Sequence, residues 1–333
     1  MGFLPQTLLL TILLFSGATT SAHSANGNLQ RFMLTDTTSG PESVAFDPSG
    51  EGPYVGVADG RILKRQLDGR GWQRFAFPSQ WSEVACHSDE MHSESECGRP
   101  LGLRFNEKTG ELYIADAYFG LMVVQPEGGW ARTVAAEADG VPFVFTNGVD
   151  VDQETGLVYF TDSSLRFNRW DHDLVVITGD ATGRFMKYDP ATKEVSVLLS
   201  GLKFPNGVAV SRDRTFVLVA STTECLVWRY WLQGSRSGHL ETFAQLPGYP
   251  DNIKRNADGD FWVAINMDRL RLGDLTGRTN KVAAVKLSRT GATLDTLDGA
   301  VMSPLSEVAE RNGTLWLGSV ELPYLGFCTT TKI

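Results

Sequence analysis

Five oxygen-bearing side chains stand at or next to the start of short apolar runs in this sequence. Glu42, Asn147, Asn206 and Asp251 occupy equivalent places, and Asn252 follows directly as a fifth. Carboxylate and amide oxygens without Cys or His are the ligands of a hard cation, so the set favours Ca²⁺ over Zn²⁺. Taken singly, each residue is typical of a turn or a strand end. Their recurrence at one register makes a calcium site the better interpretation.

The shared register comes from an internal repeat of two short strands joined by a turn. Six copies can be laid over one another: PESVAFDPSGEGPYVGVAD, PLGLRFNEKTGELYIAD, TNGVDVDQETGLVYFTD, PNGVAVSRDRTFVLVAS, PDNIKRNADGDFWVAIN and LSEVAERNGTLWLGS. Their second residues, Glu42, Leu101, Asn147, Asn206, Asp251 and Ser306, recur every 45 to 59 residues. That period, with room for four strands, is typical of a propeller blade. The sequence therefore predicts an all-β fold, a six-bladed β-propeller whose channel-lining strands begin at these residues.

The ends of the sequence suggest how the ring closes. The last repeat leaves room for too few strands, and the segment from Leu29 to Thr35 precedes the first repeat. We expect this N-terminal segment to supply the missing strand of the last blade, which removes exposed sheet edges. No linker or low-complexity tract interrupts residues 23–333, so one propeller domain is expected there.

The Asn206-Gly207 pair shows how the repeat changes a local interpretation. Between two apolar runs, Asn-Gly is a strong signal for a hairpin turn. Alignment with the other copies instead puts Asn206 at a strand start facing the channel axis. Leu101 and Ser306, the poor ligands at this register, would leave an open side for a small-molecule substrate.

Composition and the N-terminal residues limit the partners and the compartment. The 333 residues include 30 basic and 39 acidic side chains, a net charge of -9, which disfavours a nucleic-acid partner. Residues 1–22 combine a short apolar run with small residues before Ala22, the pattern of a cleaved signal peptide. We expect a monomer without a membrane anchor that enters the secretory pathway, with the vacuole, the ER lumen and the extracellular space all open.

Such a compartment permits disulfide bonds and glycosylation. Cys86 and Cys97 bracket the polar stretch HSDEMHSESE, where a disulfide would hold a loop with little apolar material. Cys225 and Cys328 are expected to be buried thiols. The sequon at Asn312 lies in a predicted hairpin turn and is expected to be glycosylated.

Histidines offer a weaker catalytic signal. His87 and His92 lie in the polar stretch between the two cysteines and could overhang the channel as acid or base, although loop histidines are more often simply solvated. No GxSxG, Walker or Rossmann motif is present.

Longer motifs point to a known family. The stretches GVDVDQETGLVYFTDSS, TGRFMKYDPATKEVSVLLSGLKFPNGVAVS, VWRYWLQG and NIKRNADGDFWV resemble the plant strictosidine synthase-like family, and similarity extends from about Gly40 to Ser319. The resemblance implies a six-bladed propeller, passage through the secretory pathway and a cysteine pair matching Cys86 and Cys97. Function does not follow from the fold, because one scaffold serves many chemistries.

At one catalytic position this sequence differs from the strictosidine synthases. Strictosidine synthases proper condense tryptamine with secologanin and use a glutamate at the channel-lining start of the last blade, which aligns with Ser306 here. Glu307 is one residue away, and strand alternation would turn its side chain to the opposite face. Strictosidine synthase activity is therefore not expected.

The axial oxygen set is similar to that of paraoxonases and of gluconolactonase or regucalcin-type lactonases. The resemblance implies a catalytic Ca²⁺ held at Glu42, Asn147, Asn206 and Asp251, with Asn252 matching a further paraoxonase ligand. Paraoxonases place a histidine at the position of Leu101, so a histidine base of that kind is not expected.

The leading hypothesis is a Ca²⁺-dependent hydrolase of esters or lactones, with Asp251 as the catalytic residue that activates water or attacks directly. One alternative is an amine-aldehyde condensing enzyme of alkaloid synthesis. Another is a non-catalytic ligand-binding propeller. Specificity is expected to come from the loops at Ser163 to Asp180 and Cys86 to Cys97.

Overall fold

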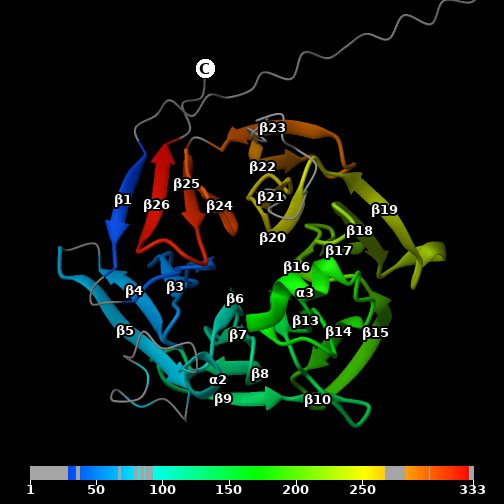
Figure 1. The fold of residues 1–333 in the computed structure, drawn as a ribbon, viewed down its shortest axis with the longest axis horizontal. Coiled ribbons are helices and arrows are strands. Elements are labelled where there is room, and N and C mark those ends of the chain that lie inside the picture. The colour runs from blue at the N-terminus through cyan, green and yellow to red at the C-terminus, as the bar shows by residue number, and fades with distance from the viewer. Residues whose placement is uncertain are drawn as a thin grey trace, which may run out of the picture.

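The predicted six-bladed β-propeller is confirmed. The computed structural model describes residues 29–34, 38–66, 69–78, 82, 86, 93–266, 282–299 and 301–329, and their strands form a ring of sheets (Figure 1). The strands are short runs rich in β-branched and aromatic residues that end at Gly, Asp or Asn turns. Within the described residues the helical segments are short: α2 (Ser93–Cys97), η1 (Arg169–Asp171), α3 (His172–Ile177) and η2 (Gly234–Arg236).

Three blades are regular four-stranded antiparallel meanders, each built in sequence order from the channel outward. Blade 3 contains β12 (Thr146–Val151), β13 (Val158–Asp162), β14 (Gly183–Asp189) and β15 (Glu194–Leu202). Blade 4 contains β16 (Pro205–Val210), β17 (Phe216–Ser221), β18 (Leu226–Trp231) and β19 (Leu240–Gln245). Blade 5 contains β20 (Tyr249–Arg255), β21 (Phe261–Asn266), β22 (Val282–Leu287) and β23 (Thr293–Asp298).

Blades 1 and 2 are joined into one eight-stranded sheet. Blade 1 contains β2 (Val44–Ala45), β3 (Tyr54–Gly56), β4 (Ile62–Gln66) and β5 (Gly71–Pro78); blade 2 contains β6 (Pro100–Phe105), β7 (Leu112–Asp116), β8 (Gly120–Val124) and β9 (Gly129–Ala135). The outer strands β5 and β9 pair in parallel from Ala76 opposite Gly129 to Pro78 opposite Ala131. A small hairpin of β10 (Glu137–Ala138) and β11 (Val141–Pro142) follows.

Blade 6 is closed by the N-terminal segment, as predicted. It contains β24 (Glu307–Arg311), β25 (Thr314–Gly318), β26 (Tyr324–Thr329) and β1 (Gln30–Met33). β1 runs antiparallel to β26, with Gln30 opposite Phe327 and Met33 opposite Tyr324. The Phe32 ring stacks on Phe327 with ring centroids 4.4 Å apart. The predicted segment extended to Thr35, which lies outside the described residues.

The cores lie between neighbouring blades, whereas the channel is bordered by polar residues. Between blades 4 and 5, for example, Phe216, Phe243 and Phe261 pack together, and each fully buried side chain of this size contributes roughly 1.5–3 kcal/mol. Near the axis the inner strands approach closely. A Cβ atom added to Gly207 would lie 2.5 Å from the Ile253 nitrogen, so the blades can meet there only because the residue is glycine.

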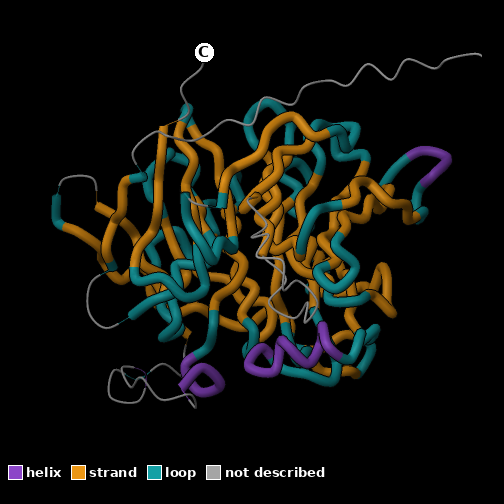
Figure 2. Tube along the Cα trace, turned by 45° about the horizontal axis from the view of Figure 1, so that its top comes forward, coloured by secondary structure: helices purple, strands orange, loops and turns teal. Residues whose placement is uncertain are grey.

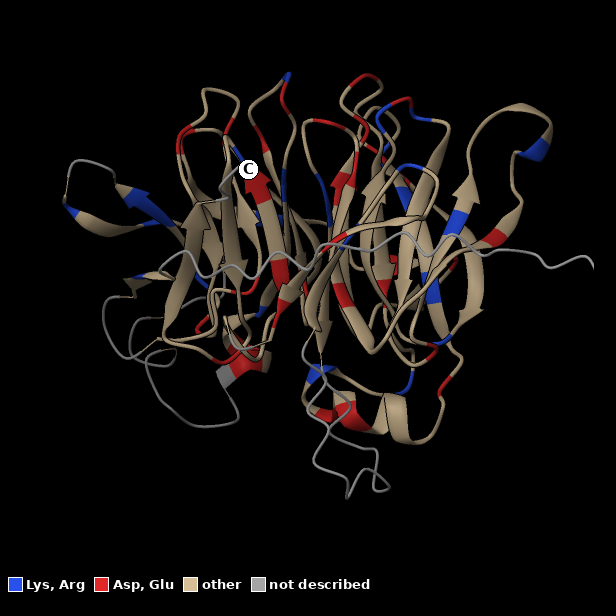
Figure 3. Ribbon diagram, turned by 90° about the horizontal axis from the view of Figure 1, so that it is seen from above, with Lys and Arg blue, Asp and Glu red and all other residues tan. Residues whose placement is uncertain are grey.

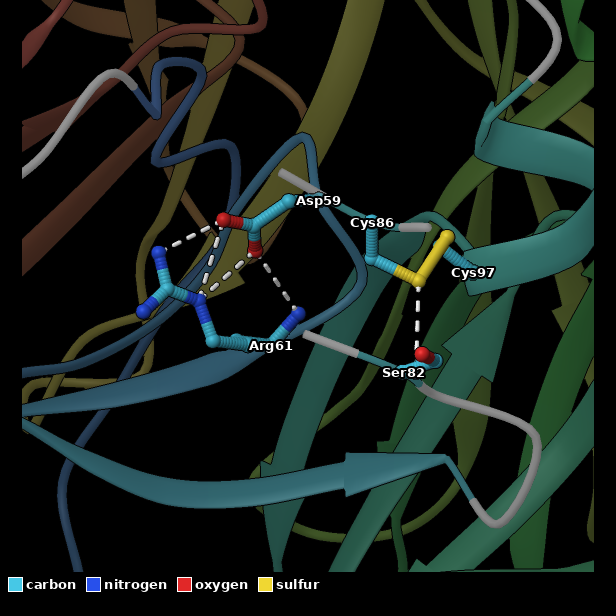
Figure 4. The surroundings of a disulfide bond; sticks show 5 residues. All are labelled: Asp59, Arg61, Ser82, Cys86 and Cys97. Carbon is cyan, nitrogen blue, oxygen red and sulfur yellow. Dashed lines mark hydrogen bonds and ion pairs between the residues drawn. A yellow bond between two sulfur atoms is a disulfide. The ribbon is translucent and has the colours of Figure 1, made fainter. Parts of the chain in front are cut away.

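Figure 4 shows the predicted disulfide between Cys86 and Cys97, whose Cα atoms are 5.6 Å apart. The Ser82 backbone nitrogen lies 3.5 Å from the Cys86 sulfur, and an ion pair between Asp59 and Arg61 lies nearby. Cys328 is buried, as expected, while Cys225 is half-buried rather than fully buried, and neither forms a disulfide. The disulfide therefore joins Cys86 to α2, which immediately precedes the first strand of blade 2.

Several sequence predictions concern the surface or the termini. Asn312 is exposed in the turn between β24 and β25, and its glycosylation stays a prediction. The predicted signal peptide, residues 1–22, lies outside the described residues. Across the described residues no helix has the length and apolar character needed to cross a bilayer. Acidic and basic residues both occur at each end of the blades (Figure 3).

Candidate functional site

A cavity of about 230 Å³ opens at one end of the propeller channel. Glu42, Asn147, Asn206 and Asp251, which start the inner strands of four blades, all line it and are all buried. The structure thus brings together four of the five predicted ligands. Asn252 is buried but does not line the cavity.

Bulges lie at the starts of the inner strands of blades 3, 4 and 5, where Asn147, Asn206 and Asp251 stand. Strand register shifts between Thr146 and Val149, between Pro205 and Val208, and between Pro250 and Ile253. A bulge interrupts the alternation of side chains between the two faces of a sheet. Asp251 lines the cavity, while the next residue, Asn252, donates from Nδ2 to Oε1 of Glu42 at 3.1 Å.

The orientation of two asparagines is fixed by the same relay in neighbouring blades. Nδ2 of Asn147 donates to Oγ of Ser163 at 3.1 Å, and that hydroxyl donates to the Pro205 carbonyl at 2.8 Å. Nδ2 of Asn206 donates to Oγ1 of Thr222 at 3.3 Å, and that hydroxyl donates to the Pro250 carbonyl at 2.7 Å. Each hydroxyl donates its single proton to the carbonyl, so it can only accept a hydrogen bond from the asparagine.

This arrangement leaves oxygen atoms without hydrogen-bond donors. Oδ1 of Asn147, Oδ1 of Asn206 and Oε2 of Glu42 are buried and have no partner among the described residues. An unsatisfied buried acceptor costs about 1–3 kcal/mol, so three around one cavity are unusual in a native protein. A bound cation would satisfy all three.

The two carboxyl groups are held in an environment that disfavours their charge. Burial raises the pKa of Asp251 to about 7, against hydrogen bonds from the Asn206 and Asn266 amides that lower it. Nδ2 of Asn266 lies 2.7 Å from Oδ2 of Asp251. Burial, followed by the charges of Asp251 and Glu307, raises the pKa of Glu42 well above its usual range. Both carboxyl groups would be better accommodated beside a cation.

The donor set fits calcium. Two carboxylates neutralise a divalent ion, and the amide oxygens of Asn147 and Asn206 supply the neutral ligands that Ca²⁺ accepts in flexible geometry. In the described part of the chain no group of three or more His, Cys, Asp or Glu side chains is placed to hold a metal. The set therefore matches a hard cation bound partly by amides and not a zinc-type site.

One wall of the cavity is apolar and another is formed by the short helices η1 and α3. Leu101, Phe145 and Phe204 pack in one cluster and line the cavity. Arg169 and His172 line it from the helical side. Figure 2 shows these helical turns at the same end of the propeller as α2. The predicted specificity loop Ser163 to Asp180 thus covers the cavity.

The inner strand of the last blade does not place an acid in the cavity. Ser306 is buried and donates from Oγ to the Glu42 carbonyl at 2.8 Å. Glu307 is fully buried and accepts hydrogen bonds from Ser43 Oγ at 2.9 Å and the Val44 nitrogen at 2.6 Å, and Lys254 Nζ lies 3.3 Å away. Neither Ser306 nor Glu307 lines the cavity.

Sequence reasoning did not single out the residues that hold the ligands in place. Ser163, Thr222 and Asn266 end or follow the second strand of their blades, in the runs YFTDS, FVLVAST and FWVAIN. Their shared place in the repeat could have identified them from the sequence. Arg169 and His172 lie in the predicted specificity loop Ser163 to Asp180, outside the repeat, and no pattern within that loop distinguished either residue. His87 and His92 lie outside the described residues.

Comparisons with known proteins agree with this architecture. A family model described as strictosidine synthase matches residues 147–235, and one described as strictosidine synthase-like, N-terminal, matches residues 22–65. The chain is 48% identical over 316 residues to Protein STRICTOSIDINE SYNTHASE-LIKE 10 of Arabidopsis thaliana, covering 86% of this chain and 84% of that protein. It is 39% identical over 330 residues to Protein STRICTOSIDINE SYNTHASE-LIKE 12 of the same plant, covering 97% and 96%.

Solved structures with low sequence identity share the fold. A gluconolactonase from Xanthomonas campestris superposes with a TM-score of 0.63 at 15% identity, covering 94% of this chain and 92% of that one. A luciferin-regenerating enzyme superposes with a TM-score of 0.60 at 13% identity, covering 91% and 95%.

Proposed function

The chain belongs to the strictosidine synthase-like family, and from that premise and the geometry of its channel we propose that it is a calcium-dependent hydrolase of esters or lactones. The observation that carries the proposal is the group of unpaired buried oxygens of Glu42, Asn147 and Asn206, which share one cavity with Asp251. The gluconolactonase among the proteins of the same fold supports hydrolysis as the reaction class.

Each residue of the site has a distinct part in this proposal. Glu42, Asn147, Asn206 and Asp251 would hold the ion, and Asn252 would orient Glu42 through Oε1. Bound calcium supplies a Lewis acid that polarises the carbonyl of the substrate and stabilises the charge that develops on its oxygen. The apolar wall of Leu101, Phe145 and Phe204 would exclude bulk water from the bound ester.

Asp251 is the proposed catalytic residue. Asn266 holds Oδ2 of this carboxylate, so its orientation within the cavity is fixed. The other oxygen would accept the proton of the water molecule that attacks the substrate carbonyl. A direct attack by the same carboxylate is the second route open to it.

The amine-aldehyde condensation receives less support from the site. Ser306 stands where strictosidine synthases have their glutamate, and its hydroxyl is committed to the Glu42 carbonyl. Glu307 is held by Ser43, Val44 and Lys254 away from the cavity. We expect no product from tryptamine and secologanin.

Substitution of two proposed ligands tests the function. Asn206→Ala and Asp251→Ala should each weaken calcium binding at least tenfold in calorimetry and reduce hydrolysis of an aryl ester and lactone panel at least 100-fold. Asn106→Ala is the matched control, because Asn106 is a buried asparagine that caps a turn after β6 through the Lys108 nitrogen. Unchanged calcium affinity in both ligand variants would refute the site.

Removal of the ion separates catalysis from a purely structural role. A ligand that binds only the folded state stabilises it by about 2.7 kcal/mol at 100 times its dissociation constant, so chelation should lower the melting temperature. Loss of hydrolysis in parallel supports the enzyme. Calcium-dependent melting without turnover of any ester or lactone would favour the non-catalytic ligand-binding propeller.

A further inference from the structure

Two insertions from different blades meet at the wall of the cavity. Nη1 of Arg169, from η1 in blade 3, lies 2.9 Å from Oε2 of Glu94, which belongs to α2 beside the Cys86–Cys97 disulfide. The Tyr118 hydroxyl donates to the same glutamate oxygen at 3.2 Å. Helix α2, which carries Glu94 and ends at the disulfide cysteine Cys97, thereby supports the position of Arg169 at the cavity.

Two guanidinium groups share one carboxylate at this junction. Glu94 is shared between two guanidinium groups, because Nε of Arg99 lies 3.8 Å from its Oε1 while Arg169 holds its Oε2. Arg99 is completely buried behind the wall. Arg169 therefore shares its carboxylate partner with a second cation, so part of its charge is available to attract an anion.

Arg169 has donors left for a ligand. Its side chain is 16% exposed and lines the cavity, and only Nη1 is used by Glu94. The Nε and Nη2 groups, which form one edge of the planar guanidinium, have no acceptor among the described residues. That edge matches the two oxygens of a carboxylate and would bind them with two parallel hydrogen bonds.

Other acidic residues of the cavity do not cancel this charge. Asp173 and Glu321 lie at the exposed rim, where solvent and salt screen them. Glu42 and Asp251 lie at the inner end and would be neutralised by a divalent ion. Arg169 is instead largely removed from water, where a charged hydrogen bond is stronger.

We propose that the free edge of Arg169, held in place by Glu94, binds a carboxylate of the substrate, so that the substrates are esters or lactones that also carry a carboxylate group. The reaction in this inference rests on the proposed hydrolase function, whereas the carboxylate-binding site does not. Arg169 is the specificity-determining residue, and Glu94 is a positioning residue that acts through it.

Matched substrates test the preference. The first pair is 4-acetoxyphenylacetate and its neutral amide, which differ in charge on the alcohol side of the ester. The second pair is the mono-4-nitrophenyl ester of adipic acid and 4-nitrophenyl hexanoate, which differ in charge on the acyl side. Charged hydrogen bonds of this kind should give the acid a roughly 10- to 100-fold higher kcat/KM than its neutral partner in at least one pair, after uncatalysed hydrolysis is subtracted. Arg169→Gln should abolish the preference, which is measured as the ratio of the acid to its neutral partner within the same variant.

Three further variants sharpen the result. Arg166→Gln is the control, because Arg166 is 63% exposed, lies three residues away and does not line the cavity. Arg169→Lys should retain part of the preference through charge alone. Glu94→Gln should reduce the preference without changing calcium affinity. Equal rates within both pairs, a preference for the amine analogue 4-(2-aminoethyl)phenyl acetate, or an unchanged preference in Arg169→Gln would overturn the proposal.

A binding measurement keeps this test independent of catalysis. Calorimetry with the unreactive probe 4-hydroxyphenylacetate should show roughly tenfold weaker binding by Arg169→Gln than by the parent or by Arg166→Gln, all loaded with calcium. If no ester or lactone is hydrolysed, the hydrolase proposal fails while this result still decides the carboxylate subsite. Equal affinity of the three proteins would refute the subsite.

Discussion

The Asn206 side chain and the glycine that follows it, Gly207, have separate roles. Gly207 lets blade 5 approach within a distance that no Cβ atom allows, and Asn206 turns an unpaired oxygen into the cavity. The Thr222 hydroxyl fixes that orientation, because its proton is already given to the Pro250 carbonyl. The residue that a local rule assigns to a turn is thus a proposed ligand within strand β16.

The relay predicts an effect of residues that do not touch the ion. Thr222→Val removes the acceptor for Nδ2 of Asn206 while nearly keeping the side-chain volume, and should weaken calcium binding roughly five- to tenfold. Ser163→Ala should act in the same way on Asn147. Thr296→Val, in the outer strand β23, is the control and should bind calcium like the parent in calorimetry. Parent-like affinity of Thr222→Val would show that the hydroxyl does not orient the ligand.

At the scale of strands, single polar side chains tie neighbouring blades together at the end of the channel opposite the cavity. Oε2 of Glu310, in β24 of blade 6, accepts hydrogen bonds from Asn256, Trp262 and Lys286 of blade 5, each at 2.9 Å. These hydrogen bonds and the Lys286 charge lower the pKa of Glu310, although burial opposes them. The junction between blades 5 and 6 therefore depends on an ionised carboxylate.

This junction predicts a pH-dependent stability. A carboxyl group with a lowered pKa in the folded state contributes stability above its unfolded pKa of 4.5, and the contribution is lost as the pH falls through the folded value. Glu310→Gln should therefore destabilise the protein by about 1–2 kcal/mol at pH 7, and this difference should shrink progressively as the pH falls below 4.5. Urea denaturation of the two proteins at several pH values measures the gap. A gap that stays constant down to pH 3.5 would contradict the proposed role of the charge.

At the scale of the whole molecule, the ring is closed by strands from the two ends of the propeller. β1 covers the edge of β26, and the ring of its Phe32 stacks on Phe327 and lies 6.2 Å from the Trp316 ring, between centroids. An uncovered β26 would expose an unpaired edge. Closure therefore links the stability of all six blades to four residues near the N-terminus.

Two neighbouring substitutions in β1 test the closure. Phe32→Ala should lower the free energy of unfolding by about 2 kcal/mol, below the usual range for phenylalanine because the ring is only half-buried. Met33→Ala is the control: Met33 is 57% exposed, and its loss should change stability by less than about 0.5 kcal/mol. Equal effects of the two substitutions in chemical denaturation would mean that packing of β1 does not hold the ring closed.

The sequence by itself determined the fold and the axial set, because both depend on a repeat. Six copies at one spacing specify six blades, and one register in each copy places Glu42, Asn147, Asn206 and Asp251 on a common axis. The tertiary structure decided what a repeat cannot carry. Asp251 lines the cavity while Asn252 bonds to Glu42, hydroxyls that follow the second strands orient the amides, and Arg169 reaches the cavity from an insertion outside the repeat. These features depend on contacts between segments far apart in the chain, and no local pattern encodes such contacts.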